Sequence, residues 1–367
     1  MKKSIFAVLA VTAISGANAQ SSVTLYGTVD EGYLATHNKE STTVPINGTQ
    51  NKTTNESINT SGIAANNFSK TRFGIKAKED LGQGNAAGAQ LEFGLNPNAA
   101  STALETRQAF VYVGNADAGT VSVGKIQTKT YEYLSENDGS GSTVVPGSIY
   151  YNHGVQGTPG IFDRANGINY SVGNGTYKLS AGYTGQTKSG EQHGTTSSYG
   201  LHGYELAGQV RSGNFFGGGA YLTGDSDYQL DAFKGVANAK AITAFAGYDF
   251  GILKTTYTYY QQQFSNYGTP GWTERYHQIG LTAPVTPAVT AFATYVIGQA
   301  RGKIIDDHNL KNNGSGNGFQ LGVKYALSKR TDIYGAYGQQ KAHYNIIGGG
   351  RETEQAQAYT VGLRHTF

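Results

Sequence analysis

Few side chains in this sequence have the type and spacing that catalysis or metal binding requires. The chain has no cysteine, so it offers no thiolate nucleophile, no disulfide and no cysteine-based metal site. Its eight histidines show no metal-ligand spacing, and nothing indicates which serine or carboxylate would accompany any of them in a catalytic group. The sequence therefore predicts no enzyme activity and no cofactor.

The charged residues of one long insertion are the remaining candidates. Residues 128–163 interrupt a series of strand-like segments, and their first half contains three carboxylates, Glu132, Glu136 and Asp138. A connection this long inside a compact β protein is usually functional or disordered. This one also contains many apolar and aromatic residues that a solvated linker would not need. We expect it to fold back inside a closed β-barrel and narrow it.

The first residues indicate export. Lys2 and Lys3 precede an apolar run, residues 5–14, that is too short to span a bilayer, and Ala17-Asn18-Ala19 forms a small-residue cleavage site. We therefore predict a cleaved signal peptide, residues 1–19, followed by one β-barrel, residues 20–367. The 28 Lys and Arg nearly balance the 25 Asp and Glu, so charge gives no argument for a nucleic-acid partner.

The composition suits a membrane barrel. No later segment reaches the roughly 20 apolar residues of a membrane-spanning helix. The chain contains 26 Tyr, and amphipathic aromatic residues form girdles at the two membrane surfaces of such barrels. Composition alone leaves a secreted β-sandwich or propeller open.

Alternation of polar and apolar residues predicts the strands. Residues 37–66 are rich in Asn, Thr and Ser, and we expect them to form an exposed loop. The predicted strands are sixteen in number and antiparallel, near residues 22–35, 66–79, 86–97, 104–115, 119–128, 164–173, 176–186, 200–211, 214–225, 238–249, 252–264, 273–283, 288–300, 316–328, 331–344 and 355–367.

The connections between these strands favour a closed barrel. Short turns alternate with longer loops, as they do in outer-membrane barrels. An even number of strands places both termini at the short-turn end, so the last strand can pair with the first. We expect all seven prolines to lie outside the strand interiors. The final strand has an apolar row that ends on the aromatic Phe367.

Several short segments spread over the whole mature chain carry a resemblance to a known family. They are residues 22–27 (SVTLYG), 71–76 (TRFGIK), 79–82 (EDLG), 106–110 (TRQAF), 119–125 (GTVSVGK) and 359–367 (YTVGLRHTF). In these segments the chain resembles the trimeric general-diffusion porins of Gram-negative bacteria, particularly those of β-proteobacteria. Two departures concern the pore: these porins often have Arg at the position of Lys125, and their third loop often contains a Pro-Glu-Phe-Gly-Gly-like segment. Here that segment is reduced to Val145-Pro146-Gly147.

The resemblance implies a sixteen-stranded transmembrane barrel whose third loop sets acids against a basic wall. Such a narrow opening creates a transverse field that orients polar solutes and disfavours apolar ones. Arg72 alternates with Phe73 and Ile75, and Arg107 alternates with Phe110 and Tyr112, so both should face the lumen. Lys125 shares parity with Val121 and Val123, so either the strand bends there or the side chain reaches an interface. The expected basic wall is Arg72, Arg107, Lys125 and Arg164, and the expected acidic edge is Glu132, Glu136 and Asp138.

The leading hypothesis is a passive outer-membrane channel for ions and small hydrophilic solutes, with a weak preference for anions. The resemblance implies a homotrimer embedded in the lipid bilayer, with lipopolysaccharide around its outer rim. The alternative is a barrel that acts as a surface adhesin or structural protein, because long Asn- and Thr-rich loops would also serve a binding surface. Conductance separates the two.

Overall fold

The computed structural model describes residues 21–47, 50–98, 104–140, 143–152, 163–185, 200–230, 233–266, 271–305 and 310–367. The predicted signal peptide, residues 1–19, lies outside the described residues.

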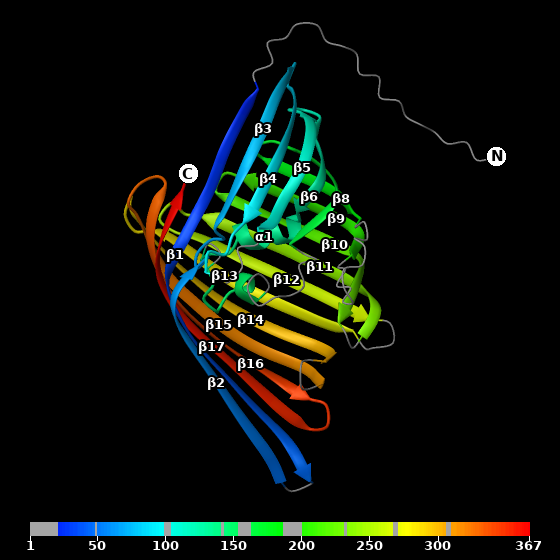
Figure 1. The fold of residues 1–367 in the computed structure, drawn as a ribbon, viewed down its shortest axis with the longest axis vertical. Helices are drawn as coiled ribbons and strands as arrows, with labels where there is room; N and C mark the ends of the chain where they lie inside the picture. Colours follow the sequence, from blue (N-terminus) through cyan, green and yellow to red (C-terminus); the bar gives the residue numbers. More distant parts are fainter. Residues whose placement is uncertain are drawn as a thin grey trace, which may run out of the picture.

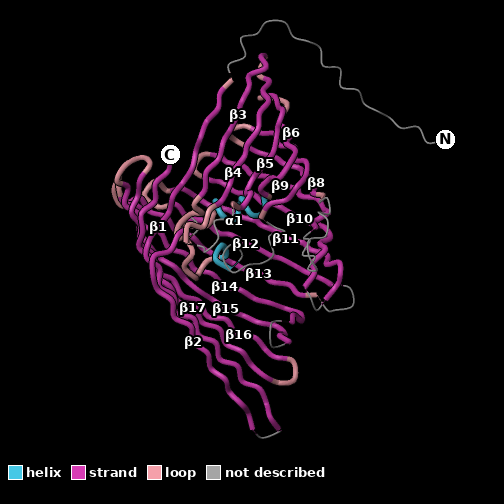
Figure 2. Tube along the Cα trace, in the orientation of Figure 1, coloured by secondary structure: helices cyan, strands magenta, loops and turns pink. Residues whose placement is uncertain are grey.

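The described residues form seventeen strands and the helix α1 (Figures 1 and 2). In chain order they are β1 (Ser22–Asn47), β2 (Gln50–Ala65), β3 (Arg72–Gly82), β4 (Asn85–Gly94), β5 (Glu105–Asn115), β6 (Gly119–Gln127), α1 (Lys129–Glu136), β7 (Arg164–Gly173), β8 (Tyr177–Thr184), β9 (Gly200–Ser212), β10 (Phe215–Leu230), β11 (Phe233–Asp249), β12 (Lys254–Asn266), β13 (Trp272–Pro284), β14 (Val289–Ile305), β15 (Leu310–Ala326), β16 (Thr331–Ile346) and β17 (Gly350–Thr366).

Sixteen of the described strands close into an antiparallel barrel. Each strand from β3 to β17 pairs with the next along the chain, and β1 closes the ring by pairing with β3 on one edge and β17 on the other. The backbone bonds between Gly27 and Phe367 end this seam at 3.1 and 3.0 Å. A closed ring leaves no open edge among these strands, which is what a barrel in lipid requires. The sixteen-strand prediction is confirmed.

The remaining strand, β2, corrects one prediction. The segment expected to be an exposed loop, residues 37–66, instead extends β1 and returns as β2, and the two form a long hairpin. This hairpin also pairs with β17 as far as Thr43. Its Thr-rich composition favours strands, but both of its faces are polar, so no alternation shows. Pro45 consequently lies inside β1 near its tip, at a register shift, and not outside the strands as expected.

The two faces of the barrel wall differ in kind. Large apolar side chains such as Val121, Tyr257 and Leu321 are exposed on one face, as expected for a surface that contacts lipid. The alternate residues of the same strands, such as Thr256 and Gln320, are polar and buried. We call these the outer and inner faces. No helix among the described residues is long and apolar enough to cross a membrane.

The buried apolar clusters lie on the inner face, where the connection between β6 and β7 packs against the wall. We call this connection, residues 128–163, the third loop. Tyr133 packs with Phe216 and Phe245, Leu134 and Ile149 pack with Leu222, and Val145 packs with Phe68. In Figure 1, α1 lies among the strands of the barrel.

Candidate functional site

Helix α1 opens the third loop and is fixed at its N-terminus by two acceptors. Thr128 is the N-cap, and its hydroxyl accepts a hydrogen bond from the amide of Tyr131 at 3.3 Å. Glu205 on β9 is buried and accepts from the amides of Lys129 and Thr130, each at 2.8 Å. A carboxylate at this end also complements the helix dipole. The wall therefore sets the direction in which the helix leaves β6.

The described remainder of the third loop, residues 137–140 and 143–152, follows the inner face. Wall side chains from β11 to β15 bind its backbone or hydroxyl groups at successive points: Thr243 to Thr130 O, Thr256 to Asn137 O, Thr282 to Gly139 O, Gln278 to Ile149 N, Thr294 to Gly147 O, and Gln320 to the Thr143 hydroxyl. Bonding at so many points fixes a segment that has little regular structure of its own.

Glycines let the third loop approach the wall backbone directly. A Cβ at Gly338 would lie 2.0 Å from the carbonyl oxygen of Pro146, and a Cβ at Gly280 would lie 3.0 Å from the Cα of Gly139. Side chains at these wall positions would therefore push the loop away.

The predicted acids of the third loop occupy two different surroundings. Glu132 is ion-paired with Lys129 at 2.6 Å. Glu136 is exposed at the end of α1, where desolvation by the surrounding protein and then the charge of Glu132 raise its pKa. Asp138 is buried and accepts from Ser140 at 2.6 Å and from Gln278 at 3.1 Å. Asp138 thus binds the loop to β13.

The predicted basic residues Arg72 and Arg107 meet at one carboxylate. Glu92 on β4 lies 2.7 Å from Nε of Arg107 and 3.6 Å from Nε of Arg72. The hydroxyl of Tyr26 donates to the same carboxylate at 3.1 Å. Sequence reasoning missed Glu92, although alternation places it on the inner row of β4. Two guanidinium groups sharing one carboxylate leave a net positive charge.

Arg107 reaches this cluster through a β-bulge, and simple alternation does not explain its direction. Val111 and Val113 are exposed, while a Cβ at Gly88 would meet the ring of Tyr112, so strict alternation would group Arg107 with the outer valines. Glu92 pairs with Gln108 and Phe93 with Thr106, so Arg107 is an extra residue in β5. A bulge re-aims side chains in this way.

Lys125 and Arg164 lie beside the end of the third loop. Gly124 has a φ of +137°, a conformation available to glycine that interrupts regular alternation. Lys125 donates to the carbonyl oxygen of Thr106 at 2.6 Å. Arg164 is ion-paired with Asp163 and its guanidinium lies over the ring of Tyr131. Burial raises the pKa of Asp163, and the neighbouring cations oppose that shift.

Further cations, which the sequence reasoning did not name as pore residues, line the inner face near the short turns. Lys76 and Lys78 are exposed on β3 and pair across the ladder with Gln90 and Gly88. On the other side, Arg211 and Lys254 lie over the ring of Phe216, at 5.3 and 4.7 Å from its centre. Regular alternation of these strands would have placed all four on the inner face.

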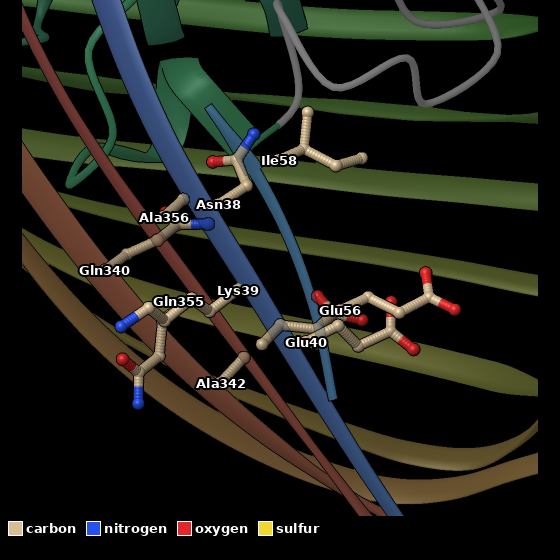
Figure 3. A pocket seen from close by; sticks show the side chains of 10 residues that line it. Asn38, Lys39, Glu40, Glu56, Ile58, Gln340, Ala342, Gln355 and Ala356 are labelled. Carbon is tan, nitrogen blue, oxygen red and sulfur yellow. The ribbon is translucent and has the colours of Figure 1, made fainter. Parts of the chain in front are cut away.

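Carboxylates line the opposite end of the barrel, beside the β1–β2 hairpin. Glu40 pairs in register with Glu56 on one side and Glu354 on the other. Figure 3 shows Glu40 and Glu56 side by side in a pocket that Glu354 also lines. The described residues contain no cluster of three or more His, Asp or Glu arranged to hold a metal ion.

A closed antiparallel sheet with an apolar outer face and a charged inner face is typical of transmembrane β-barrels, and this chain has that arrangement. The sequence profile of the Gram-negative porin family matches residues 7–343. The chain belongs to this family, and it is an outer-membrane porin.

Comparisons with individual proteins agree with this family assignment. Over 388 residues the chain is 29% identical to the outer membrane porin protein 32 of Delftia acidovorans, and 25% identical over 428 residues to an outer membrane porin of Bordetella pertussis, in both cases across all of each chain. The fold also matches an anion-selective porin from Comamonas acidovorans, with a TM-score of 0.71, 22% identity and coverage of 95% of this chain and 100% of that one. The trimer form of OmpT from Vibrio cholerae matches with a TM-score of 0.62, 15% identity and coverage of 95% and 99%. The Delftia, Bordetella and Comamonas proteins are porins by name.

Proposed function

We propose that this porin is a water-filled channel for passive diffusion of ions and small hydrophilic solutes. The observation that carries the proposal is the charge of the inner face. Lys76 and Lys78 are exposed there, and Arg72 keeps 30% of its side chain accessible beside Glu92. Exposed charges need water around them, so the lumen beside β3 is hydrated.

The proposed constriction lies between the third loop and the wall of β3 to β7. Its basic side consists of Arg72, Arg107, Lys125 and Arg164, with Glu92 and Asp163 as their local partners. On its acidic side we place Glu132 and Glu136, whereas Asp138 contributes by holding the loop to β13. Fixed opposite charges around a narrow opening orient polar solutes during passage.

A weak preference for anions is the selectivity that these charges favour. Arg72 and Arg107 outnumber their carboxylate, and Lys76, Arg211 and Lys254 lie beyond them toward the short turns. The Comamonas acidovorans porin with the same fold is anion-selective by its title. The acid row at Glu40 lies at the other end and would attract cations there.

We also propose that the porin is a homotrimer, as OmpT of Vibrio cholerae is in its trimer form. The outer face supports this. Exposed tyrosines occur on β1 and on most strands from β7 to β17, but the large exposed residues of β3 to β6 are aliphatic, among them Ile75, Leu91 and Val111. Tyrosine belts mark membrane interfaces, so a sector without them suits contact with another subunit. Lipid and outer-leaflet lipopolysaccharide would surround the remaining sector.

Single-channel recording in a planar bilayer tests this function. Purified protein should insert and conduct in ohmic steps, and a salt gradient should give a reversal potential toward the anion. Folded protein without conductance would refute the channel and favour an adhesin or structural barrel. The proposed signal peptide, residues 1–19, is tested by the mass of the protein isolated from outer membranes.

A further inference from the structure

Residues 66–71, between β2 and β3, leave the wall and turn into the barrel. We call them the inner segment. Asn66 starts it in a left-handed conformation, with a φ of +68°, which Asn tolerates better than most residues. The side chain of Asn66 then accepts from the amide of Thr71 at 2.5 Å, which closes the segment on itself.

Asp30 on β1 holds the inner segment. It has no exposed surface, and one carboxylate oxygen accepts from the amides of Phe68 at 3.0 Å and Ser69 at 2.6 Å. The other oxygen accepts from the hydroxyl of Tyr334 on β16 at 2.5 Å. A buried carboxylate costs free energy unless hydrogen-bond donors surround it. Here the inner segment supplies two such donors, the amides of Phe68 and Ser69.

These hydrogen bonds place Phe68 in a buried cluster on the far side of the seam. Its ring is 1% exposed and meets Phe292 edge-on at 5.8 Å and Tyr334 at 5.0 Å. Arg364 and Lys324 lie over the ring at 5.1 and 5.3 Å. Phe68 thereby ties the turn to β14, β15, β16 and β17.

The tip of the third loop, at Val144 and Val145, packs on this inner segment. The amide of Val144 donates to the carbonyl oxygen of Asn67 at 3.0 Å, and Val145, which has no exposed surface, packs in the same cluster as Phe68. The third loop is thus bound at its start by Glu205 and at its tip by a segment that Asp30 positions.

We propose that Asp30 and Phe68 are positioning residues for diffusion: they lock the tip of the third loop and thereby fix the width of the channel. This inference rests on the proposed channel function. Loss of the Asp30 carboxylate leaves buried amides of the inner segment without their acceptor. The tip then exchanges between docked and undocked positions, and the current through the pore fluctuates with it.

The first experiment compares Asp30→Ala, which removes the acceptor altogether, with wild type in single-channel recordings. The loss of hydrogen bonds to a buried charge shifts the docked-to-undocked ratio by roughly tenfold. We expect frequent transitions to a wider level and a larger solute cut-off in liposome swelling. Glu352→Ala is the matched control, because Glu352 is also a buried carboxylate, on β17, bound to Lys311. Its traces should stay as steady as those of wild type.

A reversible cross-link separates positioning from general damage. The chain has no cysteine, so Asn67→Cys with Val144→Cys introduces a single pair at residues already in backbone contact. In the Asp30→Ala background, oxidation should restore the steady level and reduction should abolish it. The proposal is overturned if folded Asp30→Ala behaves as wild type, or if the oxidised cross-link leaves the fluctuations unchanged. A wild type that does not conduct would instead refute the channel itself.

Discussion

Replacing Glu92 by Gln should make the channel more selective for anions. Glu92 is the carboxylate shared by Arg72 and Arg107, at 3.6 and 2.7 Å. The amide oxygen of Gln can still accept from Arg107, and its NH2 group can donate to the hydroxyl oxygen of Tyr26, which now donates to Glu92, so the substitution removes one negative charge and changes little else. The two guanidinium groups then act on permeating ions without their counter-charge.

The size of the effect follows from Coulomb's law. A unit charge about 7 Å from an ion changes its free energy by about 0.6 kcal/mol in water, and 0.1 M salt, with a Debye length of about 10 Å, reduces this by about half. The anion gains what the cation loses, so the permeability ratio shifts by about 0.6 kcal/mol, or roughly threefold. At 1 M salt the shift should nearly vanish, because the Debye length falls to about 3 Å.

The assay is the reversal potential across a planar bilayer under a KCl gradient. The control is Glu105→Gln, which also removes one carboxylate, but one that is 54% exposed and paired with Lys70 at the end of β5. It should shift the ratio less than Glu92→Gln. An unchanged or more cation-selective Glu92→Gln channel would refute the view that Arg72 and Arg107 set the local charge of the lumen.

Three other perturbations test separate parts of the account. The pKa of Glu136 is raised above the ordinary glutamate value of about 4.3. Lowering the pH through this pKa should protonate Glu136 and therefore move the reversal potential toward anions. The Glu136→Gln channel should not show this pH-dependent shift, and a shift that persists in it points to another group. Glu205→Ala removes the acceptor of two α1 amides, and each lost hydrogen bond is worth about 1 kcal/mol. The variant should show more open-channel noise, while its barrel still resists SDS at room temperature. A quiet channel would show that Thr128 alone fixes the helix. Val111→Arg should give monomers in mild detergent, whereas Leu321→Arg, on the tyrosine-bearing side of the barrel, should leave trimers; the opposite pattern would place the subunit contact elsewhere.

The barrel was predictable because its physics is repetitive. Period-2 alternation with one apolar face specifies a strand in lipid, and sixteen such segments with alternating short and long connections close into a ring. Strand ends beyond the membrane were not predictable in this way. The β1–β2 hairpin has water on both faces, so its residues show no apolar row, and only its Thr content favours a strand.

The positions of the candidate site residues were partly predictable from the sequence, and their contacts were less so. Alternation identifies Arg72 as an inner residue, but the bulge that turns Arg107 inward depends on pairing with β4 and leaves no local mark. Glu92 and Glu205 did have a signal, since each is an acid on the inner row of a predicted strand. The wall glycines that admit the third loop acquire meaning only when the loop backbone lies beside them.

The measurement that most directly tests the central claim is the single-channel current of wild type and Arg107→Glu under a salt gradient. We expect conducting steps that appear in threes, and a reversal potential that moves toward cations in the mutant. Absence of conductance from folded protein would contradict the channel. A mutant with unchanged selectivity would contradict the assignment of Arg107 to the wall of the pore.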